Sequence, residues 1–121
     1  MKVRARANLG STTLGRMNKT EARYAALLDA QVLAGTLHAW RYEAIKLRLA
    51  DNTYYTPDFW LVYPDGACGF DEVKGFWRDD ARVKIKVAAE QFPWFRFRAA
   101  SWSKAMGWQV EDFQDFEERA T

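Results

Sequence analysis

The chain has 121 residues and a hydrophobic fraction of 49%, which is the size and composition of one folded domain rather than two. A single cysteine, Cys68, excludes an internal disulfide, and with only one histidine present it also excludes a metal site built from several Cys or His ligands. No apolar stretch approaches the roughly 20 residues that cross a bilayer, and the N-terminus lacks a secretory segment, so we expect a cytoplasmic protein without a membrane partner.

The net charge of +2, from 18 basic and 16 acidic residues, hides a gradient along the chain. Residues 1–50 carry nine basic and three acidic side chains, a net of +6, whereas residues 99–121 carry two basic and five acidic ones, a net of −3. The basic half could bind a polyanion such as nucleic acid, although a solvated surface would have the same composition.

The first expected element is an irregular basic arm over residues 1–17, because glycine, serine and threonine residues interrupt it. A helix should follow from about Asn18, a residue type that caps helices, to about residue 34, with Gly35 just past its end. Glu21 falls on the apolar stripe of this helix and should therefore face the body of the fold.

Three strands are expected next, joined as a meander. Residues 44–49 alternate between apolar and polar side chains, which is typical of a half-buried strand, and residues 51–53 should form the turn after it. Residues 59–63 are almost wholly apolar and fit a buried strand. Pro64-Asp65-Gly66 then predicts a turn, from which residues 67–74 return as the third strand.

A second helix is expected over about residues 79–91, and residues 95–99 alternate as a fourth strand after it. A helical crossover permits this strand to run parallel to its neighbour. Residues 101–121 are rich in aromatic and acidic side chains and should form a short helix and a tail that extend the same domain. The predicted fold is therefore α/β, with a core over residues 18–100 in which helices flank a mixed central sheet of about four strands.

The candidate chemistry lies in Asp58 and in the run Glu72-Val73-Lys74. A hairpin between the two expected strands would place Asp58 and Glu72 side by side, and strand alternation puts Val73 on the opposite face. Two adjacent carboxylates repel unless a cation lies between them, and their oxygens suit a hard cation such as Mg²⁺, for which Mn²⁺ would substitute. With Lys74 beside a metal-bound water, these groups suit hydrolysis of a phosphodiester.

Pro57-Asp58 followed by Glu72-Val73-Lys74 resembles the signature of the PD-(D/E)xK, or restriction-endonuclease-like, nuclease superfamily. The chain is similar to small phage nucleases of this superfamily and to the phage endonuclease I type of Holliday-junction resolvase. The resemblance covers about residues 18–100 and is carried by residues 19–24, 55–61, 72–77, 79–84 and 91–93.

The resemblance implies a magnesium-dependent DNA endonuclease with a restriction-endonuclease-like core. It would make Asp58 and Glu72 metal ligands and the carbonyl of Val73 a further ligand. Lys74 would be the catalytic lysine, and Glu21 a carboxylate that joins the site directly or through water. Such an enzyme would act on branched DNA, such as Holliday junctions, in phage recombination or DNA processing within the host cytoplasm.

Each assignment has a structural alternative. Glu21 could be the return arm of a capping box at the start of the first helix. Asp58 could be a turn residue, and Glu72 with Lys74 could be an exposed ion pair on an edge strand. Asp71 should point away from Glu72 by strand alternation and is not assigned to the metal. For the whole chain, the alternatives are a nucleic-acid-binding protein that keeps the fold without catalysis, and a protein-interaction module.

Basic residues offer candidate DNA contacts outside this site. Arg78, Arg82 and Lys86 recur every four residues as one stripe on the second helix, although a solvated helix face has the same pattern. Arg16 and Lys19 could add phosphate contacts. Junction cleavage needs two symmetric cuts, so we expect a homodimer. Its interface could include tryptophans that exceed the needs of one small core: Trp60, Trp77, Trp94, Trp102 and Trp108.

Overall fold

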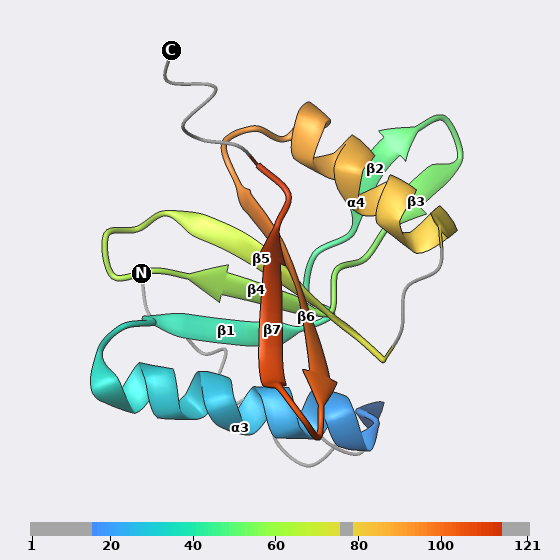
Figure 1. Cartoon of the computed structure of the whole chain (residues 1–121). Helices are drawn as coiled ribbons and strands as arrows, with labels where there is room; N and C mark the ends of the chain where they lie inside the picture. The colour runs from blue at the N-terminus through green and yellow to red at the C-terminus, as the bar shows by residue number, and fades with distance from the viewer. Residues whose placement is uncertain (1–15, 76–78, 115–121) are drawn as a thin grey trace.

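A computed structural model of the chain describes residues 16–75 and 79–114. Within these ranges the protein is a mixed α/β structure, in which two helices accompany a five-stranded sheet and a separate two-stranded sheet (Figure 1). The predicted α/β class is therefore confirmed, while the predicted arm lies almost wholly outside the described residues. No helix in the described part of the chain is long and apolar enough to cross a membrane.

Helix α3 (Lys19–Ala34) begins and ends as the sequence predicts. Asn18 is its N-cap, and the chain leaves it at Gly35, whose φ of 83° lies in the left-handed region that glycine adopts without steric cost. Tyr24 and Leu28 are buried on one face of the helix. This face holds α3 against the main sheet, which positions the first turn of the helix near the candidate site.

The main sheet has the strand order β1-β4-β5-β6-β7, five strands instead of about four. The strands are β1 (Ala39–Tyr42), β4 (Phe59–Val62), β5 (Cys68–Lys74), β6 (Arg96–Ser103) and β7 (Gly107–Asp112). Neighbouring strands are antiparallel except β5 and β6, which run parallel, as predicted for a strand that follows a helical crossover. The central strand of the sheet is therefore β5.

The predicted meander is wrong in its first strand. β2 (Leu47–Ala50) does not join the main sheet but pairs with β3 (Thr53–Tyr55) across the predicted turn, and β1 lies beside β4 instead. Alternating buried leucines identify β2 as a half-buried strand but carry no information on its partner. The tight turn, in which Asn52 has a φ of 53°, favours pairing with the residues that follow at once.

The short helix predicted after residue 101 is also wrong over residues 101–114, where the structure describes this part of the chain. β6 continues to Ser103, and β7 returns beside it through a turn that includes Gly107 at a φ of 70°. Trp102 and Trp108 are register partners whose rings pack edge to face, so cross-strand aromatic contact stabilises a hairpin here. The described part of the C-terminal extension thus belongs to the main sheet.

Two core clusters lie on opposite faces of the main sheet. Helix α4 (Asp79–Gln91), which confirms the second predicted helix, packs with the β2–β3 hairpin over one cluster, which includes Ile85 and Phe97. Helix α3 covers the other cluster, which includes Leu28 and Phe59 (Figure 1). Burial of each such side chain stabilises the fold by about 1.5–3 kcal/mol.

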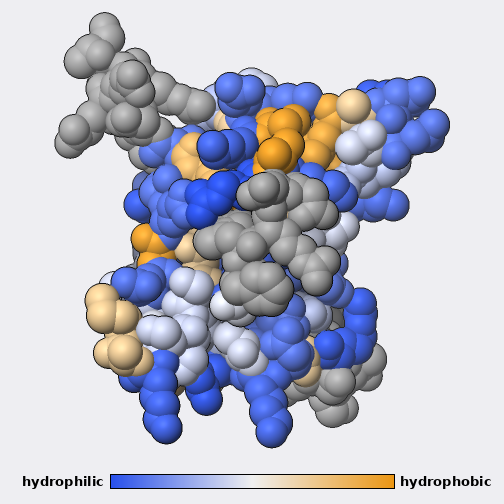
Figure 2. Space-filling view, turned by 45° about the vertical axis from the view of Figure 1, so that its right-hand side comes forward, coloured by the Kyte–Doolittle hydropathy of each residue, from blue (hydrophilic) through white to orange (hydrophobic). Residues whose placement is uncertain are grey.

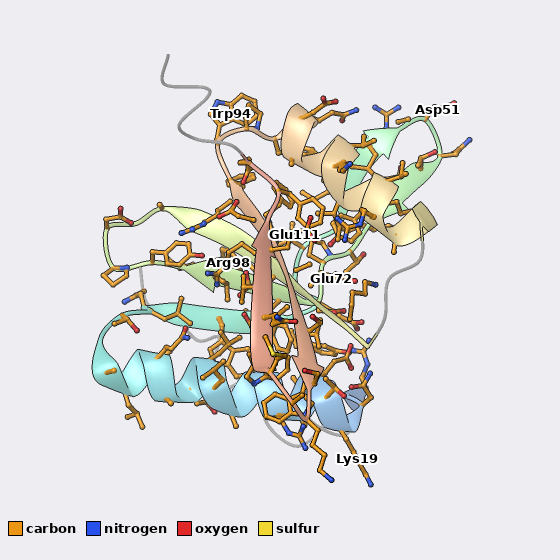
Figure 3. All side chains as sticks on the ribbon, in the orientation of Figure 1. Lys19, Asp51, Glu72, Trp94, Arg98 and Glu111 are labelled. Carbon is orange, nitrogen blue, oxygen red and sulfur yellow. The ribbon has the colours of Figure 1, made fainter. Side chains whose placement is uncertain are left out.

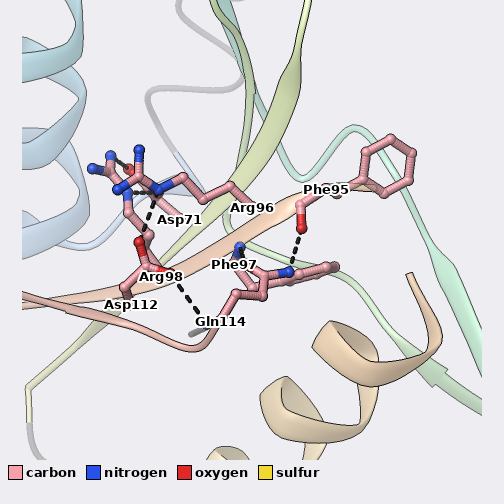
Figure 4. A network of polar contacts seen from close by, with 7 residues as sticks. All are labelled: Asp71, Phe95, Arg96, Phe97, Arg98, Asp112 and Gln114. Atoms are coloured by element: carbon pink, nitrogen blue, oxygen red, sulfur yellow. Dashed lines mark hydrogen bonds and ion pairs between the residues drawn. The ribbon is translucent and has the colours of Figure 1, made fainter. Parts of the chain in front are cut away.

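A buried carboxylate, Asp71, lies on the α3 face of β5 and is fully covered. Its partner on β6, Arg98, donates from Nε to Oδ1 at 2.9 Å and from Nη2 to Oδ2 at 2.8 Å (Figure 4). Tyr24 of α3 donates its hydroxyl to Oδ2, and burial together with the charge of Asp71 raises the pKa of Tyr24. This forked, charge-assisted pair neutralises Asp71 on the face away from Glu72, as strand alternation predicts.

The tryptophans divide between core and surface. Trp60 and Trp108 are partly buried and pack against the core clusters, whereas Trp94 is 75% exposed and Trp102 is 38% exposed. Trp77 lies outside the described residues. The homodimer stays a prediction, with Trp94 and Trp102 as exposed candidates for an interface.

We predict that Asp71→Ala lowers the free energy of unfolding by about 3–5 kcal/mol, because the partly buried Arg98 guanidinium loses its carboxylate. The matched control is Asp51→Ala, since Asp51 has an 89% exposed side chain that lies 3.7 Å from Arg48. Its loss should cost less than about 1 kcal/mol. Urea denaturation measures both variants, and equal losses would contradict a stabilising role for the buried pair.

Candidate active site

The candidate site lies where β4 begins and β5 ends, at the point where their backbone ladder stops. The last paired residues at this end are Phe59 and Asp71. In the same antiparallel register Asp58 lies opposite Glu72, but the preceding residue is Pro57, which has no N–H and cannot extend the ladder. The backbone groups at this point therefore need side-chain partners.

Two carboxylates supply these partners through crossed hydrogen bonds. Val73 N donates to Asp58 Oδ2 at 2.9 Å, and Asp58 N donates to Glu72 Oε1 at 3.1 Å. Tyr55, the last residue of the β2–β3 hairpin, donates its hydroxyl to the same Glu72 oxygen at 2.9 Å. Asp58 is 8% exposed and Glu72 is 7% exposed, so the predicted carboxylates come together in a site that is nearly closed to water.

Lys74 completes the predicted group of charges. Its Nζ lies 2.9 Å from Glu72 Oε2, and its side chain is 24% exposed, so it extends from the buried pair toward solvent. Figure 3 shows Glu72 between the part of the molecule that carries α4 and the part that carries α3. Val73 packs in the α3 cluster on the other face. An exposed edge pair is excluded, because β5 is central and Glu72 is buried.

The charged form of Asp58 is disfavoured in this setting. Burial, together with the charges of Glu72 and Glu21, raises the pKa of Asp58 to about 8. The hydrogen bond from Val73 N and the charge of Lys74 act in the opposite direction. A bound cation would offset the burial and the repulsion that together keep a proton on this carboxyl near neutral pH.

Glu21 forms the capping box and also lies within electrostatic reach of Asp58. Asn18 Oδ1 accepts from Glu21 N at 2.7 Å, and Glu21 Oε1 accepts from Asn18 N at 2.9 Å. The hydroxyl of Tyr42, the last residue of β1, donates to the same Glu21 oxygen at 3.1 Å. The structural alternative is thus confirmed, and a second role stays open because the charge of Glu21 raises the pKa of Asp58.

The carboxylates fit a hard cation in their chemistry. Mg²⁺ usually binds through one or two carboxylates together with water and substrate phosphate, and Asp58 with Glu72 offers such a pair. Within residues 16–75 and 79–114, no group of three or more Asp, Glu, His or Cys side chains could hold one metal ion. Glu21 stays a predicted carboxylate of the site, acting directly or through water, and the Val73 carbonyl stays a predicted ligand.

The basic stripe predicted on α4 is partly engaged within the protein. Arg82 pairs with Glu111 of β7 at 2.6 Å, and its guanidinium lies 5.7 Å from the ring centre of Phe113. Lys86 is exposed to solvent, and Arg78 lies outside the described residues. Binding of DNA by this stripe stays a prediction.

The basic residues predicted near the first helix lie on the surface. Arg16 pairs with Glu43 at 2.7 Å, although its side chain is still 64% exposed. Lys19 is exposed in the first turn of α3, at the lower edge of the view in Figure 3. These positions are open to a phosphate, and their contact with DNA likewise stays a prediction.

The sequence pattern does not identify three residues that the fold brings to the site. Tyr55 donates to Glu72, and burial together with that carboxylate raises the pKa of Tyr55, which keeps the hydroxyl a donor. Tyr42 binds Glu21, and Lys84 of α4 lines a pocket that includes Glu72. Tyr55 has a local signal, its place just before Thr56-Pro57-Asp58, whereas the other two depend on packing between elements distant in sequence.

Comparisons with known proteins return no match: no family model, curated protein or solved structure matches the chain. The case for a function therefore depends on the chemistry of the site. That case has two parts, the convergence of Asp58, Glu72 and Lys74, and the motif that these residues form.

The raised pKa of Asp58 predicts a pH dependence in metal-free protein. The pKa of Asp58 in the folded state, about 8, exceeds the ordinary value of 3.8. As pH rises between these values the unfolded state loses its proton first, so the folded state is most stable at low pH and loses stability as pH rises toward 8. Between about pH 5 and pH 8, wild type should lose on the order of 3–4 kcal/mol relative to Asp58→Asn, which does not titrate there. Urea denaturation in EDTA measures the difference, and parallel pH profiles would contradict it.

Proposed function

We propose that the protein is a magnesium-dependent endonuclease that hydrolyses phosphodiester bonds in DNA. The observation that carries the proposal is the convergence of Asp58, Glu72 and Lys74 at the ends of two neighbouring strands, with the charged form of Asp58 disfavoured. Two buried carboxylates beside a lysine suit phosphate chemistry. A cation held by the carboxylates and the lysine ammonium would both attract the phosphate.

In the proposed reaction a water oxygen gives one proton to solvent and attacks the phosphorus atom, one phosphorus–oxygen ester bond breaks, and the leaving oxygen takes a proton from solvent. A bound Mg²⁺ would polarise a phosphoryl oxygen and lower the pKa of a coordinated water. Asp58 and Glu72 would hold the ion, in orientations fixed by Val73 N and the Tyr55 hydroxyl. Lys74 would stabilise the negative charge that develops on the phosphate.

We also propose a restriction-endonuclease-like core of the PD-(D/E)xK superfamily. The order of a helix, an antiparallel hairpin that carries the carboxylates, a second helix and a parallel strand supports this relationship. Membership would favour structure-selective cleavage of branched or Holliday-junction DNA, in phage recombination or DNA processing. Two symmetric cuts would require a homodimer.

Wild-type protein should cut DNA only with Mg²⁺ or Mn²⁺ present. Asp58→Ala and Lys74→Ala should each lower kcat about 100-fold or more, because each removes a group that acts at the reacting phosphate. The substrates are four-way-junction, flapped, single-stranded and linear DNA, with magnesium or with EDTA, and products are resolved on denaturing gels. Asp65→Ala, in the exposed turn at the other end of β4 and β5, is the control and should cut normally.

The outcomes separate the possible functions. If wild type cuts none of these substrates with magnesium, the enzyme proposal fails, and binding without cleavage would favour the alternative of a nucleic-acid-binding protein. If both substitutions leave cleavage unchanged, the enzyme proposal survives but the site is misassigned.

The variant Glu21→Gln separates the two roles of Glu21. Glutamine keeps an oxygen for the cap, so the melting temperature should stay within about 2 °C of wild type. Loss of the charge near Asp58 should lower kcat by about tenfold or more. Asn18→Ala is the converse variant, which should cost about 1 kcal/mol of stability and retain cleavage. Wild-type kcat in Glu21→Gln would leave Glu21 with the cap alone.

A further inference from the structure

A pocket opens beside the carboxylates, between α4 and the β2–β3 hairpin. Its volume is about 310 Å³. The residues that define it come from three elements: Tyr54, Tyr55 and Thr56 at the end of the hairpin, Glu72 and Lys74 on β5, and Lys84 on α4. We call it the hairpin pocket. Because Glu72 and Lys74 are in its wall, a ligand in the pocket would lie next to the proposed reaction centre.

The hairpin pocket has an excess of positive charge. Glu72 is the one acidic residue among its lining residues, and its Oε2 is already paired with Lys74. Lys84 is exposed, and its Nζ makes only a long contact of 3.4 Å to the Tyr54 carbonyl, with no ion pair to any described residue. Lys46 adds further charge nearby, since its Nζ lies 4.5 Å from the centre of the Tyr54 ring.

The surface around the hairpin pocket is polar. Figure 2 brings the side of the molecule with α4 and the hairpin forward, and most of that surface is hydrophilic, with hydrophobic residues in small groups. Ala81 is the one aliphatic residue that lines the pocket. An exposed ammonium in a polar pocket suits an anion rather than an apolar ligand.

Lys84 differs in its surroundings from the basic residues that sequence spacing selects on the same helix. Arg82 is paired with Glu111. Successive helical residues turn by about 100°, so Lys84 points roughly opposite to Lys86, which does not line the pocket. Of these three side chains, Lys84 is the one that lines the same pocket as Glu72.

We propose that Lys84 binds a phosphate of the DNA backbone next to the phosphate that is cut. The proposal rests on the proposed nuclease function and adds a path for the DNA strand, which would cross Lys74 and enter the hairpin pocket toward Lys84. Lys84 is then a positioning residue, since it holds the strand while Asp58, Glu72 and Lys74 act at the cut. A lysine binds phosphate as a point charge and reads no base, so this contact adds affinity without sequence preference.

The salt dependence of binding tests the contact directly. Wild type, Lys84→Ala and the control Lys104→Ala, an exposed lysine in the β6–β7 turn, are titrated with four-way-junction DNA in EDTA at several salt concentrations. Fluorescence anisotropy reports binding without cleavage. Lys84→Ala should reduce the magnitude of the slope of log affinity against log salt by about 0.9. If the variant and wild type bind equally at 1 M salt, the variant then binds roughly eightfold more weakly than wild type at 0.1 M salt. Lys104→Ala should keep the wild-type slope.

Kinetics distinguish positioning from a structural role. Lys84→Ala should raise KM with little change in kcat, because the contact is the same in the ground state and the transition state, and Lys84→Arg should restore KM in part. The melting temperature should stay within about 2 °C of wild type. A lower melting temperature with an unchanged salt slope would mean that Lys84 only anchors the hairpin, and would overturn the proposal.

Two further outcomes keep this proposal separate from the nuclease function. If wild type cuts DNA and the salt slope falls in Lys86→Ala but not in Lys84→Ala, the stripe predicted from the sequence binds the DNA and the Lys84 assignment fails. If wild type cuts no DNA under any condition, the nuclease function fails. Lys84 could then still bind a phosphate, which the slope alone would show.

Discussion

The site depends on one constraint, the end of the β4–β5 ladder at Pro57. Proline brings no N–H, so the backbone pairing that orders the rest of the hairpin cannot continue. Asp58 and Glu72 replace it, each accepting a backbone N–H from the opposite strand. These bonds satisfy donors that would otherwise be buried without partners, and they draw two carboxylates into a site with little water. The fold thereby satisfies its hydrogen bonds but leaves the negative charge only partly compensated.

Neighbouring residues of β5 show two ways to bury a carboxylate. Asp71 faces α3 and is held by the forked guanidinium of Arg98, whose two hydrogen bonds leave its charge neutralised in place. Glu72 faces the other side and has one lysine, Lys74, which is partly exposed. In the first arrangement the charge of Asp71 is fully paired, which stabilises the fold. The second shares its one cation with the adjacent Asp58, so the two carboxylates are less fully compensated, and the cation of the proposed function would complete the compensation.

The parts of this structure that sequence predicts are those set by near neighbours. Asn18 and Gly35 bound α3 because capping is local, and the Asp58/Glu72 pairing follows from a hairpin with a short turn. Alternation could not tell which strand pairs with β2, nor that the chain after residue 101 forms β7, because partners are chosen by packing across the whole sheet. Lys84 is missed for the same reason, since helical periodicity gives the faces of α4 but not what each face meets.

The β2–β3 hairpin explains how so short a chain forms both a core and a pocket. Because it leaves the main sheet, it can pack against α4, where Gln91 donates to the Leu49 carbonyl, and still leave a space beside β5. Tyr55 joins the two roles: its ring is part of the α4 core cluster, while its hydroxyl donates to Glu72. Any shift of the hairpin relative to α4 would therefore change the width of the hairpin pocket and the hydrogen bonding of Glu72 together. A DNA strand bound in the hairpin pocket would therefore alter the hydrogen bonding of the Glu72 carboxylate through Tyr55.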